Sequence, residues 1–443
     1  KNFITDIQEA TNIPLPNGAN SDCKWYQFKI PIREPHRKVG LIDGYQSIKF
    51  IRLFLKDFEE PIILRFATFE LVSGEWRKYT DNLLTPGLYP SGTQSENTTF
   101  TVASVNIEEN GKRTPIPYVL PPGIEREKIY ATTSMTDMNE QSQSLKIGEL
   151  SDGDARAIYK SMELDMRQYK HLRMFVHAEQ LNEFDQYKKG DLSLFVRLGT
   201  DFTNNYYEYE LPLTFTPWYT GYNNEELIWP ESNNVDIDLE QLVKVKENRN
   251  AKIRANDLTV SSTIPYHEII DGKKMTVVGM PNIAGVKVLM IGIRNPKKQN
   301  INDNDDMLPK SAEIWINELR LTDFNRSGGW AATGFARTNL ADLGDVSLSA
   351  SHRSAGFASL EQSISEISQE AITSLDFATN IEVGKFFPED WGIRLPVHFD
   401  YSQSVRNPKY NPLDPDVKLE NDLLSYRTEK ERDSIRHMVQ DYV

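Results

Sequence analysis

The sequence has little cysteine, no surplus of positive charge and no long apolar run, and each shortage excludes a class of protein. Its 443 residues include one cysteine, Cys23, which excludes a disulfide-stapled scaffold and a cysteine-rich zinc module. Lys and Arg number 50 against 64 Asp and Glu, a net charge of −14, which argues against nucleic acid as a partner because phosphate contacts need clustered cations. The longest run that is almost wholly apolar, 286–293, is far shorter than the roughly 18 residues of a membrane-spanning helix.

Motifs for catalysis and for cofactor binding are also missing. There is no nucleophile elbow, P-loop or glycine-rich dinucleotide fingerprint. His171 and His177 share a strand face, but roughly 20 Å of strand separates them, too far to hold one metal ion. The acidic run 302–306 offers oxygen ligands for Ca²⁺, although a solvated loop is the more common role of such a run. We therefore predict a protein that is not an enzyme, with no catalytic residue, no cofactor and no metal site.

The two ends of the sequence look like interruptions of a longer chain. Lys1 is not followed by a basic and then an apolar segment, so no signal peptide is visible, and Val443 ends a charged stretch. These features predict an internal piece of a larger protein.

What the sequence does contain is β-structure. Short β-branched and aromatic runs alternate with Gly, Pro, Asn and Asp turns, which is typical of sandwiches and barrels. Segments 50–71 and 171–200 are similar pairs of strands, and 286–321 is a looser third pair. The first two pairs place an arginine between apolar residues at equivalent positions, Arg52 and Arg65, then Arg173 and Arg197. This recurrence predicts tandem β-sandwich modules of related architecture.

Alternation with a period of two assigns each of these runs an inner and an outer face. The inner face is predicted to hold Ile51, Leu53 and Leu55 in the first segment and Leu172, Met174 and Val176 in the second. The outer face is predicted to hold Phe50, Arg52 and Phe54, and then His171, Arg173, Phe175 and His177. An arginine flanked by aromatic rings can stack a sugar, but packing against a neighbouring domain is the more common role.

Between the modules, residues 110–127 contain four prolines, which favour an extended segment that cannot be a central strand. It can serve as a spacer or as a strap across another surface, and both interpretations stay open.

The last third alternates more regularly and over longer runs. Residues 391–405 set Ile393, Leu395, Val397, Phe399 and Tyr401 against Arg394, Pro396, His398, Asp400 and Ser402. Residues 373–387 set Leu375, Phe377, Ile381 and Val383 against Asp376, Asn380 and Glu382, and 345–352 set Val346, Leu348 and Ala350 against Ser347, Ser349 and Ser351. The pattern is typical of outer-membrane strands, apolar toward lipid and polar toward a wet lumen, although half-exposed soluble strands show it too. Trp330, Trp391, Phe386 and Phe387 stand at strand ends, where an aromatic girdle is expected.

Three long motifs resemble one known family. They are "VNIEENGKRTPIPYVLPPGIERE" (105–127), "ELSDGDARAIYKSMELDMRQYKHLRMFVHAE" (149–179) and "PKSAEIWINELRLTDFNRSGGWAATG" (309–334). Together with "FIRLFLKDFEEPIILRFATFEL" and "PEDWGIRLPVHFDYSQSVRNPKYNPLDPD", they resemble the SprA/Sov family, the giant outer-membrane proteins of gliding motility and type IX secretion in Bacteroidota.

The resemblance implies an outer-membrane channel that passes folded proteins with C-terminal signals to the cell surface and supports gliding motility. It implies as partners a smaller outer-membrane barrel that shuttles cargo, a periplasmic plug protein, the secreted cargo proteins and outer-membrane lipid. It carries no catalytic motif to transfer.

The combined prediction is a mainly β chain of jelly-roll-like β-sandwich modules associated with strands of a very large transmembrane β-barrel. The predicted parts are the end of a first sandwich (1–104), a proline-rich connector (105–144), a second sandwich (145–327), barrel strands (328–412), and a charged loop or short helix (413–443). The alternative is a carbohydrate-binding jelly-roll surface module. Its candidate sugar-stacking residues are Tyr206, Tyr207, Tyr209, Trp218 and Tyr219.

Overall fold

The computed structural model describes residues 3–14, 20–28, 30, 37, 51–54, 56–59, 64–67, 69, 76–86, 97–126, 128–130, 135–297, 306–325, 328–359, 361–362, 367–426 and 428–442. The chain divides into two compact units, Lys1–Gly74 and Glu75–Val443. Every helix in the part of the chain so described is too short or too polar to cross a bilayer.

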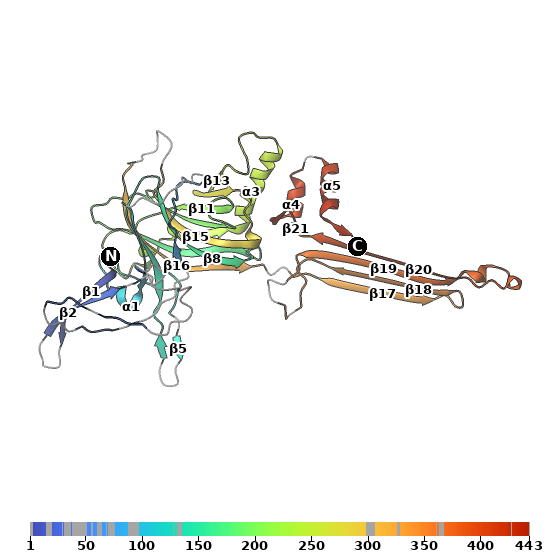
Figure 1. Cartoon of the computed structure of the whole chain (residues 1–443), viewed down its shortest axis with the longest axis horizontal. Coiled ribbons are helices and arrows are strands. Elements are labelled where there is room, and N and C mark those ends of the chain that lie inside the picture. The colour runs from blue at the N-terminus through green and yellow to red at the C-terminus, as the bar shows by residue number, and fades with distance from the viewer. Residues whose placement is uncertain are drawn as a thin grey trace. The chain divides into compact units, whose positions relative to one another are not determined.

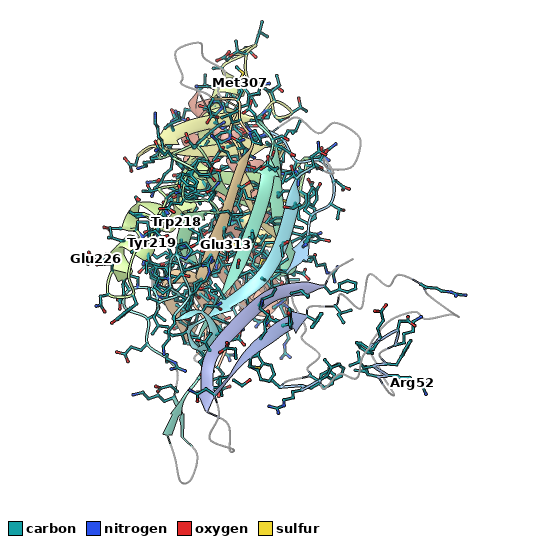
Figure 2. All side chains as sticks on the ribbon, turned by 90° about the vertical axis from the view of Figure 1, so that its left-hand side faces the viewer. Arg52, Trp218, Tyr219, Glu226, Met307 and Glu313 are labelled. Carbon is teal, nitrogen blue, oxygen red and sulfur yellow. The ribbon has the colours of Figure 1, made fainter. Side chains whose placement is uncertain are left out.

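The first unit contains an antiparallel hairpin of β1 (Ile4–Pro14) and β2 (Asn20–Phe28). The predicted inner face of segment 50–71 is wrong at its described residues. Ile51 and Leu53 are 49% and 52% exposed on an irregular stretch that also carries Arg52 (Figure 2). Leu55 lies outside the described residues. Alternation gave these residues an apolar face, but burial requires a second surface to cover that face.

The second unit contains a β-sandwich of two antiparallel sheets (Figure 1). In spatial order, the seven-stranded sheet contains β13 (Tyr266–Ile270), β14 (Lys273–Val278), β11 (Tyr206–Pro212), β10 (Ser193–Gly199), β15 (Val286–Arg294), β8 (Ala155–Leu164) and β3 (Arg77–Lys78). The five-stranded sheet contains β12 (Val235–Asp238), β9 (Tyr169–Gln180), β16 (Lys310–Phe324), β7 (Gln141–Leu150) and β4 (Thr99–Asn106). The prediction of a mainly β chain with a sandwich is confirmed.

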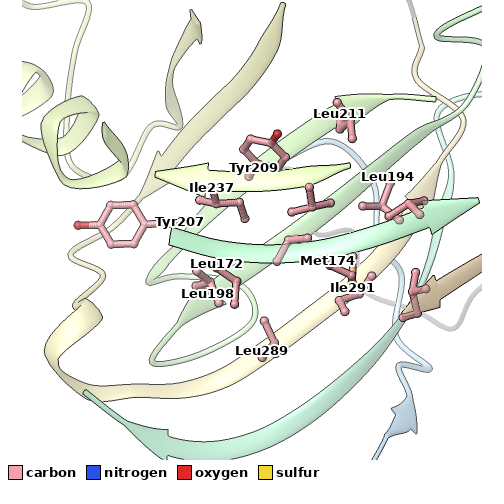
Figure 3. Packing of buried hydrophobic residues seen from close by; sticks show 14 of the residues in the cluster. Leu172, Met174, Leu194, Leu198, Tyr207, Tyr209, Leu211, Ile237, Leu289 and Ile291 are labelled. Carbon is pink, nitrogen blue, oxygen red and sulfur yellow. The ribbon is translucent and has the colours of Figure 1, made fainter. Parts of the chain in front are cut away.

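One hydrophobic core lies between these two sheets (Figure 3). Leu172, Met174 and Val176 of β9 are buried in it, as predicted. Leu289 and Ile291 of β15 belong to the same core. Each fully buried side chain of this size stabilises the fold by about 1.5–3 kcal/mol, so the sandwich is held by its interior rather than by surface contacts.

The second and third of the similar strand pairs belong to the same sandwich. β9 pairs with β16 and β10 pairs with β15, so the second and third similar segments interleave within one sandwich. Both segments lie within the predicted sandwich 145–327, and the pairing joins strands that are far apart in the chain. Similar strands satisfy similar buried environments, and their sequences do not say which partner each will take.

Helix α3 (Leu239–Arg254) follows the short edge strand β12. The Asp238 side chain accepts hydrogen bonds from the backbone N–H groups of Glu240 and Gln241, which satisfies the first turn of the helix. The apolar side of α3 joins the sandwich core through Leu242 and Val245, and the same side carries the buried Lys246.

The proline-rich segment is a strap across the outer face of the five-stranded sheet. After the single turn α1 (Ile107–Asn110), Ile116, Tyr118 and Val119 are buried against Trp315 of β16 and Trp229. The Trp229 indole N–H donates to the Val119 carbonyl at 2.9 Å. The sequence allows two roles for this segment, a spacer and a strap. It is a strap, because side-chain contacts hold it on the sheet without strand pairing. The strand pair β5 (Lys128–Tyr130) and β6 (Met135–Asp137) follows it.

The long sheet is formed by β17 (Ala331–Asn339), β18 (Gly344–Arg353), β19 (Glu370–Glu382) and β20 (Pro396–Pro408), in chain order and all antiparallel. After it come β21 (Tyr410–Asn411), β22 (Asp414–Lys418), α4 (Leu419–Leu424), α5 (Glu429–Val439) and the two-residue β23 (Asp441–Tyr442), which pairs with β20. The helical spacing of Ile435, Met438 and Val439 correctly predicts α5, although Tyr442 lies beyond the helix in β23.

Candidate functional site

The long sheet sorts its side chains by chemistry onto two faces. One face carries the cross-strand neighbours Leu348, Phe377 and Tyr401, then Val346, Thr379 and Phe399, then Ile381 and Val397. The other carries Ser349, Asp376 and Ser402, then Ser347, Ala378 and Asp400, then Ser351, Ser374 and Ser404. Cross-strand partners share a face, so the register gathers apolar groups on one side and polar groups on the other. The predicted sorting of these strands is confirmed.

Both faces of the long sheet are open. On the apolar face Phe399 is 54% exposed, and Leu348, Leu375, Val397 and Tyr401 are exposed as well. In an antiparallel sheet with one solvated side, the apolar side normally packs on a core. An uncovered apolar face of this kind marks a surface that meets another apolar phase or partner.

The polar face has its own hydrogen bonds between strands. The Ser402 hydroxyl donates to Asp376 Oδ1 at 2.5 Å, and the hydroxyls of Ser374 and Ser404 are 3.1 Å apart. Asp345 accepts from the Asn380 side-chain amide at 3.1 Å. These bonds fix the polar side chains across neighbouring strands without burying them, so this face is suited to contact with water.

Aromatic side chains mark both ends of the long sheet. At the end where β17 begins, the Trp330 and His352 rings are 4.5 Å apart. At the opposite end, the hairpin between β19 and β20 carries Phe387 and Trp391, whose rings stack at 6.1 Å. Trp330 and Trp391 are both exposed. Their placement at strand ends is therefore as expected.

After the last strand of the long sheet, the chain returns to the sandwich. We call residues 409–424 the return segment. Its strand β22 presents Asp414 and Asp416 to Lys246 of α3, whose side chain is fully buried. The Lys246 ammonium lies 2.7 Å from Asp416 Oδ1, bonds Asp414 as well, and donates to the Pro281 carbonyl at 2.7 Å. The Tyr207 hydroxyl donates to Asp416 Oδ2 at 2.7 Å. One buried cation thus joins two distant parts of the chain.

Electrostatics in this cluster follow from burial. Removal from water raises the pKa of Asp414, the nearby Asp416 carboxylate raises it further, and Lys246 opposes both, which leaves the Asp414 pKa at about 6. Burial likewise raises the pKa of Tyr207 well above its usual value, so the phenol remains a proton donor to Asp416.

Further contacts fasten the return segment along its length. The Arg167 guanidinium donates to the Pro415 carbonyl at 3.1 Å and stacks over the Tyr410 ring. Lys418 pairs with Glu240 at 2.7 Å, and Arg254 pairs with Asp422 at 3.1 Å. Val417 enters the sandwich core. Sequence reasoning missed this role, and the one signal for it was the alternation of Asp414 and Asp416 with Pro415 and Val417, which is typical of a short strand.

A second buried polar cluster lies under the strap. Arg113 of the strap bonds Glu179 of β9, lies 3.2 Å from Glu313 of β16 and stacks over the Trp315 ring. His177 stacks on Trp315 with ring centroids 3.9 Å apart and is fully buried. The prediction that His177 lies on the outer face is correct, but the strap covers that face. Arg113 pairs with both carboxylates and Lys146 lies 3.8 Å from Glu313, so this cluster joins the strap to the sheet beneath it.

The other residues singled out in the sequence are dispersed. His171 pairs with Asp236, far along β9 from His177, and the described residues contain no group of His, Cys, Asp and Glu able to hold a metal ion. Residues 302–305 lie outside the described part, and Asp306 pairs with Lys310. Arg197 is buried against Glu208, whereas Arg173 is half-exposed between Asp236 and Asp323.

The predicted sugar-stacking set is not a surface. Tyr206, Tyr207 and Tyr209 are at most 1% exposed, because they point from β11 into the packed interior on both sides of its sheet. Trp218 and Tyr219 lie on a loop after β11, with rings nearly perpendicular at 78°. The five residues therefore do not form a platform for a sugar, and the structure argues against the carbohydrate-binding alternative built on them.

The fold and the long sheet together define a mainly β protein in which a sandwich is joined to an antiparallel sheet with one apolar and one polar open face. The family model SprA_N, described as motility related/secretion protein, matches residues 1–423, and the chain belongs to this family. The suspected family is thereby confirmed, and with it a role in motility or secretion. A comparison with curated proteins gave no significant match.

Proposed function

We propose that the long sheet is part of the wall of an outer-membrane channel that conducts folded proteins in type IX secretion and supports gliding motility. Its apolar face, with Phe399 and Val397, contacts lipid, and its polar face, with Asp376 and Ser402, lines the hydrated lumen. The sorting of two open faces by strand register carries the proposal, because a bilayer strand needs lipid on one side and water on the other.

Strand length supports the same function. β19 and β20 have 13 residues each, more than the roughly 9–11 that a tilted membrane strand needs. A strand of this length extends about 43 Å, and a tilt of about 40° reduces its span to about 33 Å, close to the thickness of the hydrocarbon layer. The exposed rings of Trp330 and Trp391 lie at opposite ends, where they would meet the two interfaces.

The edges of the long sheet require additional strands. β17 has one neighbour, β18, and the outer side of β20 meets only the two residues of β23 among the described strands. Unpaired backbone groups cannot be left in hydrocarbon, so both edges would pair with further strands of the same wall.

A conduit needs partners rather than a catalytic centre. The proposed partners are cargo proteins with C-terminal signals, a smaller outer-membrane barrel that delivers them, and a periplasmic plug that closes the lumen. The serines and acids of the polar face, such as Ser349 and Asp400, form a hydrated wall with little apolar surface to retain a folded cargo. No enzymatic role is proposed.

Single-cysteine labelling tests the face assignment in the full-length protein in its own membrane. In a Cys23→Ser background, bimane attached at Phe399→Cys or Tyr401→Cys should be quenched by brominated phospholipid. Bimane at the neighbouring Asp400→Cys or Ser402→Cys should instead be quenched by aqueous iodide. Val176→Cys, at a fully buried core position, is the control that should take up no bimane in the folded protein. If all four wall positions respond alike to the two quenchers, the lipid-and-lumen assignment is wrong.

A further inference from the structure

An exposed aromatic loop on the sandwich has no role in the wall or in the return segment. It comprises residues 217–227, between β11 and the end of the single-turn helix α2 (Glu225–Ile228). Tyr219 is 68% exposed, Tyr222 67% and Leu227 50%, and Trp218 is half-buried beside Tyr219. Figure 2 shows Trp218, Tyr219 and Glu226 at one margin of the sandwich. Aromatic side chains are favoured in protein interfaces because they bury a large area at little entropic cost.

The backbone of this loop is held in place. The Thr220 hydroxyl donates to the Pro217 carbonyl at 2.7 Å, and the Thr216 N–H donates to Ala178 of β9 at 2.8 Å. Tyr219 adopts a left-handed φ of 63°, an unfavourable conformation for a bulky residue that persists only where its surroundings impose it. The loop backbone is therefore ordered before a partner binds, which lowers the entropy lost on binding.

The charge around the loop selects the partner. Residues 198–243 contain no Lys or Arg and nine acidic residues. Several of those acids are paired, for example Glu208 and Glu210 with the buried Arg294, and Glu240 with Lys418 at the surface. Glu225, Glu226 and Glu231 are exposed and have no ion-pair partner among the residues that the structure describes. The rings are thus bordered by negative charge that nothing described in the chain neutralises.

We propose that the loop 217–227 is a docking site for an extended, arginine- or lysine-bearing segment of a partner protein. Guanidinium or ammonium groups stack on Tyr219 and Tyr222 and pair with Glu225 and Glu226, while Leu227 contacts an apolar side chain of the same segment. Cations over aromatic faces and opposite charges nearby reinforce each other, because both favour the same group at the same place. A sugar is the poorer fit because the Trp218 and Tyr219 rings are nearly perpendicular.

The test measures binding of a fluorescein-labelled peptide, Gly-Arg-Leu-Arg-Gly-Arg, to the intact chain by fluorescence polarisation at physiological salt. The matched peptide carries citrulline in place of each arginine, which keeps the shape and removes the charge. We expect the arginine peptide to bind at least about 10-fold more tightly than the citrulline peptide. Tyr219→Ala/Tyr222→Ala should weaken the arginine peptide about 10-fold, and Glu225→Gln/Glu226→Gln about 3- to 10-fold with a smaller salt dependence.

Two control variants separate the loop from the general acidity of the chain. Glu183→Gln/Glu429→Gln removes two exposed carboxylates elsewhere, one of them next to the exposed ring of Phe184, and should leave the affinity unchanged. Tyr219→Phe/Tyr222→Phe keeps both rings and should retain binding. Equal binding of the two peptides, or equal loss in the Glu183/Glu429 control, overturns the proposal. Binding of a glycan panel that Tyr219→Ala/Tyr222→Ala abolishes, without peptide binding, overturns it in favour of a sugar site.

Discussion

The five-stranded sheet of the sandwich and the long sheet are built from the same kind of strand and reach opposite environments. Both are antiparallel, and both alternate apolar with polar side chains. In the first, Met174 and Val176 are buried beneath a second sheet, whereas in the second Phe399 and Val397 are exposed. Alternation therefore specifies that two faces differ, and the presence or absence of a covering layer specifies what each face meets.

The sandwich as a whole and the long sheet also differ in how they hold charge. In the sandwich, Glu208 lies fully buried between Arg197 and Arg294. Burial alone would raise its pKa, but Arg294 and Arg197 outweigh that effect and lower the pKa of Glu208 to about 2. In the long sheet, Arg337 pairs with Asp345 at 3.4 Å with its side chain 62% exposed. The sandwich encloses its ion pairs, while the long sheet leaves this one to solvent and salt.

The largest effect is expected from breaking an enclosed ion pair. Arg294→Met leaves the Glu208 and Glu210 carboxylates short of a buried partner and should lower the free energy of unfolding by about 3–5 kcal/mol. Arg337→Met, which breaks the exposed pair, should change it by less than about 1 kcal/mol. Denaturant titration followed by the fluorescence of the buried Trp229 and Trp315 measures both, and equal losses would contradict the difference drawn between the sheets.

Truncation of an apolar side chain should also lower the free energy of unfolding far more in the sandwich than in the long sheet. Ile291→Ala empties a fully buried position and should cost about 2–5 kcal/mol in the same titration. Leu375→Ala, on the exposed face of the long sheet, should cost less than about 0.5 kcal/mol outside a membrane because no covering layer is lost. A large loss in Leu375→Ala would mean that its face is packed.

In the membrane, the cost of an introduced charge in the long sheet should depend on the face that carries it. Tyr401→Arg places a charge toward lipid near the middle of β20 and should destabilise the inserted protein by about 2–4 kcal/mol. Ser402→Arg, beside Asp376 on the polar face, should have a mild effect. The yield of heat-modifiable folded protein in outer membranes measures both effects. Equal yields would contradict the assignment of one face to lipid and the other to the lumen.

The smallest predicted effect concerns pH and the return segment. The pKa of Asp414 is raised to about 6, so between about pH 4 and 6 the folded protein binds a proton that the unfolded chain releases. Stability from this group is complete below the unfolded pKa and is lost as the pH rises through about 6. Asp414→Asn should remove this pH dependence of the free energy of unfolding, which totals at most about 3 kcal/mol.

A second acid of the same contact provides a control of opposite sign. Lys418 lowers the pKa of Glu240, so its contribution is present at neutral pH and declines as the pH falls through the folded pKa. Glu240→Gln should therefore remove a small slope of the other sign. Unfolding titrations of both variants across about pH 3 to 8 measure the two slopes. Slopes of the same sign would show that the buried cluster has been misread.

Sequence reasoning succeeded where periodicity and local composition carry the information. The faces of β9, the sorting of the long sheet, the position of α5 and the family were all predictable from neighbouring residues. Sequence reasoning failed where burial depends on which other segment packs against a strand. Ile51 and Leu53 alternate as well as Leu172 and Met174 but are exposed, and the tyrosines of β11 are interior rather than stacking residues. The predicted sandwich 145–327 contains both similar strand pairs, but the sequence did not specify that β9 pairs with β16 and β10 with β15.

By itself the sequence determined that this chain is built from β-strands with chemically distinct faces, because side chains of a strand alternate whatever surrounds them. Only the tertiary structure decided which apolar faces are covered, that the proline-rich segment is a strap, and that Lys246 receives Asp414 and Asp416 from a distant strand. Those outcomes depend on contacts between residues far apart in the chain. Local patterns do not encode such contacts, and folding selects them by the area and charge that each arrangement can bury.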